Sequence, residues 1–80
     1  MDNLGDIAAF VRTAERLSFA EAARDLGLSP SAVGKSVVRL ETSLGVKLFH
    51  RTTRRVSLTE EGVLLHDRCR RILDDLRDTE

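Results

Sequence analysis

The sequence predicts a mainly α-helical fold with one short β-hairpin and a long final helix. Three observations predict it: apolar residues recur at helical spacing in four segments, capping residues and glycines bound these segments, and apolar residues alternate before the last of them. A chain of 80 residues forms one small domain. We divide it into residues 1–59, with three helices and the hairpin, and residues 60–80, with the long helix.

The composition is that of a globular protein, because 41% of the residues are hydrophobic and 32% are charged. No apolar run approaches the roughly 20 residues of a membrane span, and the N-terminus lacks the layout of a signal peptide. The single cysteine, Cys69, excludes an intramolecular disulfide and fits a reducing compartment. We therefore expect a cytoplasmic protein that does not bind membranes.

The first helix is expected over residues 4–16. Asn3 is the expected N-cap, and Asp6 lies in the first turn, where the helix dipole favours an acid. An apolar stripe at helical spacing, widened by Phe10, should face the core. This stripe consists of Leu4, Ile7, Ala8, Val11 and Ala14.

The second helix is expected over residues 19–26. Ser18 and Glu21 have the spacing of a capping box, and Gly27 follows as the left-handed residue that ends a helix. The residues expected to face inward are Phe19, Ala22, Ala23 and Leu26.

The third helix is expected over residues 30–44. Ser29 is the N-cap, Pro30 occupies the first position, where its missing N–H costs nothing, and Gly45 ends the helix. A short glycine-containing link joins this helix to the second, which is the form of a helix-turn-helix. The expected buried stripe consists of Val33, Val37, Leu40 and Leu44.

Residues 46–58 change to strand character. Val46 and Leu48 alternate, as do Val56 and Leu58, and a basic stretch lies between the two pairs. We expect a two-stranded hairpin that packs on the helices, because an isolated hairpin is only marginally stable. Together with the three helices, the hairpin makes a winged helix-turn-helix.

The fourth helix begins at Glu60, behind the N-cap Thr59, and extends to about residue 79. Its length of about 30 Å exceeds what the small domain can cover. Apolar residues spaced by four, three and four form a coiled-coil-like seam, which we expect to be a homodimer interface. The seam consists of Leu65, Cys69, Ile72 and Leu76, broadened by Leu73.

The net charge is zero, but the charges are unevenly distributed. Residues 29–58 carry six basic side chains and one acidic one, a net charge of +5, whereas residues 1–28 and 59–80 have net charges of −2 and −3. A local basic block of this kind predicts contact with nucleic-acid phosphates.

The order and spacing of many residues resemble those of the LysR-type transcriptional regulators, over roughly residues 4–76. The resemblance rests on Ser18-Phe19, Ala22-Ala23, Leu26, Ser29, Ser31-Ala32-Val33, Leu40-Glu41, Leu44-Gly45, Leu48-Phe49, Arg51, Arg54, Leu58-Thr59 and Gly62. It implies a DNA-binding domain and a linker helix that dimerises. It also implies a small-molecule effector, bound by a C-terminal domain that is absent from this chain.

The resemblance and the shape of DNA together indicate which residues of the third helix contact DNA. Its exposed N-terminal face should enter the major groove, where every base pair can be distinguished. Lys35 is the expected base contact, to guanine, or else a phosphate contact. Gly34 stands where the family usually has Ser or Thr, so we expect a close backbone approach there. The full set is Ser29, Pro30, Ser31, Gly34, Lys35 and Arg39.

In the hairpin, Arg54 matches the wing arginine of the family and is expected in the minor groove, because A·T-rich tracts attract guanidinium groups there. Arg51 either pairs with Glu41, which would brace the hairpin, or binds a phosphate. Thr52 and Arg55 are further expected phosphate contacts.

Other site chemistries lack support in the sequence. His66 and Cys69 lie three residues apart on one helix, but a structural zinc site needs four ligands and the sequence offers no second cluster. No catalytic triad, carboxylate pair or Gly-rich phosphate loop is recognisable, so we expect no metal, no cofactor and no enzyme.

The function that the sequence favours is sequence-specific binding of double-stranded DNA, by a homodimer on a pair of palindromic half-sites. A winged helix used for protein–protein contact is one alternative, and it would require an apolar recognition face. A module that serves mainly for dimerisation is the other, and it is compatible with DNA binding.

Overall fold

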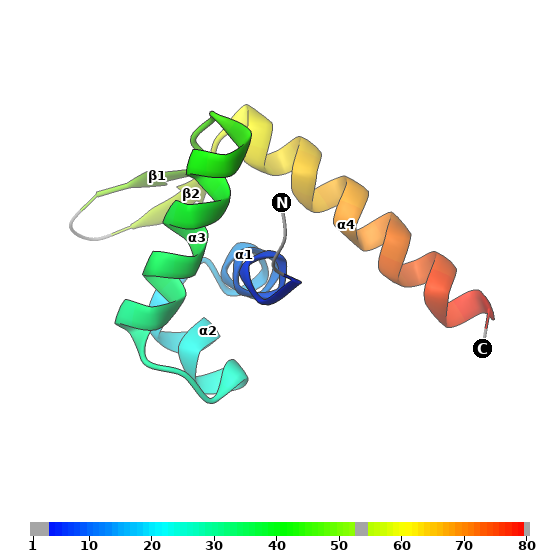
Figure 1. Ribbon diagram of the computed structural model, residues 1–80, viewed down its shortest axis with the longest axis horizontal. Coiled ribbons are helices and arrows are strands. Elements are labelled where there is room, and N and C mark those ends of the chain that lie inside the picture. The colour runs from blue at the N-terminus through cyan, green and yellow to red at the C-terminus, as the bar shows by residue number, and fades with distance from the viewer. Residues whose placement is uncertain (1–3, 53–54, 80) are drawn as a thin grey trace.

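The structure is a computed structural model that describes residues 4–52 and 55–79. Within these ranges, four helices and a two-stranded hairpin follow in the predicted order (Figure 1). The elements are α1 (Leu4–Arg16), α2 (Phe19–Leu26), α3 (Pro30–Leu44), β1 (Phe49–Arg51), β2 (Val56–Leu58) and α4 (Glu60–Thr79). The predicted winged helix-turn-helix with a long final helix is therefore confirmed. The expected N-cap Asn3 lies outside the described residues.

The predicted caps define the helix-turn-helix. The hydroxyls of Ser18 and Ser29 accept hydrogen bonds from the backbone amides three residues on, at 3.2 and 3.1 Å, and so begin α2 and α3. Gly27 and Gly45 end these helices in the left-handed conformation, with φ of 69° and 72°. The turn between α2 and α3 is thereby confined to residues 27–29.

The core lies where the three shorter helices meet the base of the hairpin. Its largest fully buried apolar side chains come from α1, α3 and the segment before β1, and they are Phe10, Val33, Val37, Leu40 and Leu48. The helices and the hairpin therefore share one core, which fixes their relative positions.

The predicted core-facing stripe of α1 is confirmed only in part, because Phe10 and Ala14 are buried and Ile7 and Val11 are partly buried against the core, but Leu4 and Ala8 are not. The buried residues of this helix are Asp6, Ala9, Phe10, Thr13 and Ala14. Leu4 is instead 82% exposed, and Ala8 is also exposed. α1 has two apolar faces, and the face that carries the Phe10 ring is the one that enters the core. The other face turns toward α4.

A second correction concerns Leu44, which was expected in the buried stripe of α3 but is exposed. Leu44 is the last residue of α3, and the chain turns away at Gly45, so the core no longer covers that position. The rest of the stripe is buried as predicted.

The hairpin is shorter than residues 46–58, but its strands pair antiparallel as expected. Its first strand is held by aromatic contacts: the Phe49 ring lies 5.5 Å from the Phe10 ring and 5.9 Å from the Phe19 ring, centroid to centroid. These contacts tie the hairpin to α1 and α2.

Thr59 joins the hairpin to α4. Its hydroxyl donates to the Lys47 carbonyl at 2.6 Å and accepts from the Gly62 amide at 3.0 Å, so the predicted N-cap is confirmed. Gly62 lies directly against the Leu48 backbone, and a Cβ at this position would collide with the Leu48 carbonyl oxygen. These contacts fix the direction in which α4 leaves the domain.

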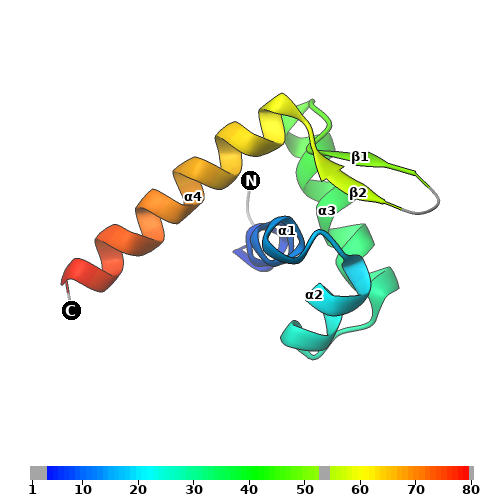
Figure 2. The same ribbon diagram turned by 180° about the vertical axis from the view of Figure 1, so that it is seen from behind.

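Helix α4 extends well beyond the rest of the domain, as two opposite views show (Figure 1, Figure 2). Leu65 packs against the core, but Ile72, Leu73 and Leu76 are exposed. None of the described helices is both long and apolar enough to span a membrane.

Candidate nucleic-acid interface

The exposed face of α3 and the first strand of the hairpin form a common surface. A hollow of about 460 Å³, which we call the recognition hollow, is lined by Ser31, Gly34, Lys35, Val38, Arg39 and Arg51. The structure thus brings together residues that were predicted separately on the helix and on the hairpin. Val38 also lines the hollow, but the sequence analysis did not predict it. Its position four residues after Gly34, outside the buried stripe of α3, could have placed it on the same exposed helical face.

At the start of α3, some side chains are exposed and have no partner among the described residues, whereas others already make hydrogen bonds within the domain. Pro30, Ser31 and Lys35 are exposed. Among the described residues, Lys35 has no hydrogen-bond or ion-pair partner, so its ammonium is available to a ligand. The Ser29 hydroxyl already accepts from the Ala32 amide, and its main role is to cap the helix.

Arg39 is anchored rather than free. Its guanidinium donates to the Asp6 carboxylate at 2.9 and 3.3 Å and to the Ser36 hydroxyl at 3.1 Å. The hydrogen bonds that Arg39 donates to Asp6 raise the pKa of Arg39 above its usual value. The Arg39 side chain is still 57% exposed, so a second anion can reach it. Sequence reasoning placed Asp6 only in the first helical turn and missed this pairing.

Arg51 is anchored in the same way, and the predicted pairing with Glu41 is confirmed. Its guanidinium lies 3.4 Å from a Glu41 carboxylate oxygen and 5.0 Å from the centre of the Phe19 ring. Glu41 is only 4% exposed and also accepts from the Leu48 and Phe49 amides, at 2.8 and 3.4 Å. Glu41 therefore stabilises the hairpin and, at the same time, positions Arg51.

Thr52 and Arg55 close the described part of the hairpin turn. The Thr52 amide and hydroxyl donate to the Arg55 carbonyl at 2.9 and 3.2 Å, and the Arg55 amide donates back to the Thr52 hydroxyl at 3.0 Å. The Arg55 residue is exposed. Arg54, the predicted minor-groove residue, lies outside the described residues.

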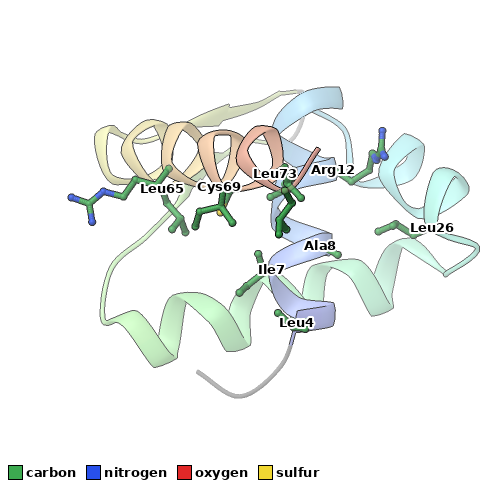
Figure 3. A pocket seen from close by; sticks show the side chains of 12 residues that line it. Leu4, Ile7, Ala8, Arg12, Leu26, Leu65, Cys69 and Leu73 are labelled. Carbon is green, nitrogen blue, oxygen red and sulfur yellow. The ribbon is translucent and has the colours of Figure 1, made fainter. Parts of the chain in front are cut away.

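A second surface, the apolar groove between α1 and α4, has a volume of about 580 Å³ (Figure 3). All the residues predicted for the dimer interface line it: Leu65, Cys69, Ile72, Leu73 and Leu76. The other wall was missed by sequence reasoning and includes Leu4, Ile7, Ala8 and Val11 of α1. Leu4 and Ala8 were wrongly expected in the core, whereas Ile7 and Val11 contact both the core and the groove, so the helical spacing of these four residues marks a second apolar face of α1.

Cys69 and His66 do not form a common site. Burial raises the pKa of the Cys69 thiol, which favours the protonated, unreactive form. Cys69 lines the groove, whereas the His66 ring packs edge-on against Phe10 at 6.4 Å. The described residues contain no cluster of three or more potential metal ligands.

Comparison with known proteins agrees with this geometry. Residues 4–63 match the family described as "Bacterial regulatory helix-turn-helix protein, lysR family". The chain belongs to the LysR family. It is a helix-turn-helix DNA-binding domain of that family and not an enzyme.

Relatives and solved structures show the same likeness. An HTH-type transcriptional regulator of Xanthomonas campestris pv. campestris is 46% identical over 78 residues, which are 98% of this chain and 23% of the relative. The BenM DNA-binding domain in a complex with catB site 1 DNA matches 96% of this LysR-family chain and 86% of its own, with a TM-score of 0.87 and 27% identity. Full-length CbnR complexed with its target DNA matches with a TM-score of 0.85 and 30% identity, over 96% of this chain and 27% of its own.

Proposed function

We propose that this LysR-family domain binds double-stranded DNA at specific sequences, as a homodimer, and so controls transcription. The recognition hollow carries the proposal, because it brings the free Lys35 and the anchored Arg39 of α3 together with the anchored Arg51 of the hairpin. Such groups neutralise phosphates while the helix reaches the bases. The DNA complexes of BenM and CbnR support this use of the fold.

In this proposal α3 lies in the major groove with its N-terminal face toward the bases. Lys35 contacts guanine or a phosphate, and Pro30 and Ser31 contact base edges. The hairpin lies at the neighbouring minor groove, where Arg54 inserts. Further phosphate contacts come from Arg51, Thr52 and Arg55.

The apolar groove between α1 and α4 is the proposed dimer surface. Residues 60–80 act as the linker helix, and the α4 helix of a second copy covers the apolar side chains that one copy leaves exposed. A two-fold pair of domains then presents two α3 helices to the two halves of a palindromic site.

Effector binding and cellular location are proposed for the whole protein. The chain spans only 23% of the Xanthomonas relative. We propose that a small-molecule effector binds a separate C-terminal domain, and that the protein works in the bacterial cytoplasm, at the nucleoid.

DNA binding as a function of salt tests the proposal. The affinity for a duplex selected from a random pool should fall with salt, by about 0.9 log units per log unit of salt for each phosphate neutralised. Lys35→Ala should lower the preference for the selected duplex over random DNA at least about fivefold if Lys35 reads a base, or reduce the salt slope by about 1 if it binds a phosphate.

The matched control is Arg70→Ala, which removes one positive charge from an exposed position on α4. It should leave both the preference and the salt slope unchanged. Identical binding by the wild type, Lys35→Ala and Arg70→Ala at every salt concentration would show that Lys35 does not contact DNA and would contradict the proposed role of the recognition hollow.

A further inference from the structure

The recognition hollow has an apolar floor, although its rim is basic. Val38 is 42% exposed on a helical face that is otherwise formed by polar and charged side chains. Gly34 lies one turn earlier, and a Cβ built there would meet no neighbouring atom within 4 Å. The floor is therefore an open space beside the Val38 side chain, and nothing in the described chain fills it.

The basic rim of the hollow is preformed. Asp6 and Ser36 hold the guanidinium of Arg39, and Glu41 and the Phe19 ring hold that of Arg51. Because both arginines are anchored by groups outside the floor, they need not be reordered when a ligand enters the hollow. A preformed site of this kind loses less side-chain entropy on binding.

The charge and the apolar floor together point to one chemical group of DNA. Basic groups on the rim complement the phosphates that border the major groove, so the floor is presented to base edges. The apolar group on those edges is the C5-methyl of thymine. We propose that the recognition hollow receives a thymine methyl against Val38, in the space that Gly34 leaves open.

This inference rests on the proposed function and adds to it the base that this part of α3 reads. It assigns sequence specificity to Gly34 and Val38, neither of which offers a hydrogen-bonding side chain. The neighbouring Lys35 remains the proposed polar contact, to guanine or to a phosphate.

Replacing thymine by uracil isolates the methyl group, because the hydrogen-bonding edge of the base is unchanged. A duplex selected from a random pool by the wild-type chain is resynthesised with each thymine in turn replaced by deoxyuridine, and each dissociation constant is measured at one salt concentration. One thymine in each half-site should show an affinity loss of about fourfold, the value for burying one methyl group at about 0.8 kcal/mol.

Two variants identify the residues that hold the methyl group. Val38→Ala removes the apolar floor, and Gly34→Ala places a methyl group in the open space. In both, the effect of uracil at that thymine should fall from about fourfold to near one, while effects at other thymines persist. Val63→Ala is the matched control, because Val63 is a similarly exposed valine on α4 and should leave the fourfold effect intact. Thermal melting by circular dichroism checks that each variant is folded.

The outcomes separate this inference from the proposed function. If the wild type selects no duplex, the proposed function and the inference both fall. If a duplex is selected but no thymine shows a methyl effect, the inference alone is overturned. It is equally overturned if the effect persists undiminished in both Val38→Ala and Gly34→Ala.

Discussion

Two buried carboxylates position two arginines of the recognition hollow. Asp6 and Glu41 are almost fully buried, and each is paired with an arginine whose outer edge reaches the surface. A buried carboxylate is costly unless it is paired and hydrogen-bonded, so these acids hold Arg39 and Arg51 firmly. On the face that we propose for DNA, the positions of Arg39 and Arg51 are therefore set by the buried carboxylates of Asp6 and Glu41.

Glu41 should contribute substantially to the stability of the fold. Glu41→Ala leaves the buried amides of Leu48 and Phe49 without their acceptor and frees Arg51. We expect a loss of about 2–3 kcal/mol in the free energy of unfolding, measured by urea denaturation. Glu15→Ala, which removes an exposed glutamate paired with Arg12, should cost under about 1 kcal/mol. Equal losses in the two variants would contradict the bracing role of Glu41.

Asp25 should make stability depend on pH. Arg16 donates to it at 2.7 and 3.1 Å, and this hydrogen bond holds the pKa of Asp25 below its usual value. A carboxyl whose pKa is lower in the folded chain stabilises the fold above its unfolded pKa, about 3.9, and loses this contribution as the pH falls through the folded pKa.

The difference in melting temperature between the wild type and Asp25→Asn should therefore be constant from about pH 7 to pH 5 and shrink below about pH 4. Because the pair lies at the surface, salt should reduce the difference as well. A difference that widens on acidification would refute the link between Arg16 and Asp25.

At the scale of elements, the sequence predicted every helix and the hairpin, because the caps are local signals. Ser18, Ser29 and Gly45 each act within one turn of their own position. α1 differs because Leu17 ends it in the left-handed region, at φ 52°, without a glycine to mark the end. The orientation of α1 could not be predicted either, since two apolar faces compete and only the packing of the other helices decides between them.

The candidate site was predicted only in part, for a related reason. An exposed basic residue such as Lys35 can be predicted from the pattern of residues within its own helix. The ion pair between Asp6 and Arg39 joins residues 33 positions apart, and no local pattern reveals it. Thr13 was likewise unexpected in the core, where its hydroxyl is satisfied by the Ala9 carbonyl at 2.8 Å.

Two helical glycines should respond in opposite directions to the same substitution. Gly62→Ala drives a methyl group into the Leu48 carbonyl and should destabilise the fold by about 1–3 kcal/mol. Gly34→Ala meets open space and should stabilise it by about 0.5–1 kcal/mol, through better helix propensity. Urea denaturation of the two variants side by side measures both changes, and the same sign for both would contradict the packing described at Gly62.

In the whole molecule, one exposed surface is basic and another is apolar, and we propose a function for each. The basic surface lies on α3 and the hairpin, and the apolar groove lies between α1 and α4 (Figure 3). A small domain buries a modest share of its surface, so covering the groove would add stability as well as symmetry. Dimer formation and DNA reading are thus assigned to different faces.

Ile72→Asp tests the groove. A carboxylate in the apolar seam should convert the chain from dimer to monomer at tens of micromolar, as measured by sedimentation velocity, because a charge buried in the interface has no partner. Val63→Asp places the same charge at an exposed position of α4 outside the groove, and it should leave the dimer intact. A wild-type chain that sediments as a monomer at this concentration would exclude the homodimer for residues 1–80.

In the proposed complex, α3 and the hairpin form the surface that contacts DNA. Backbone amide chemical shifts of the ¹⁵N-labelled chain, followed while the selected duplex is added, test it most directly. We expect the largest changes in residues 29–39 and 50–56, with little change along the second half of α4. The largest changes along the apolar groove, with the amides of Lys35 and Val38 unmoved, would contradict it.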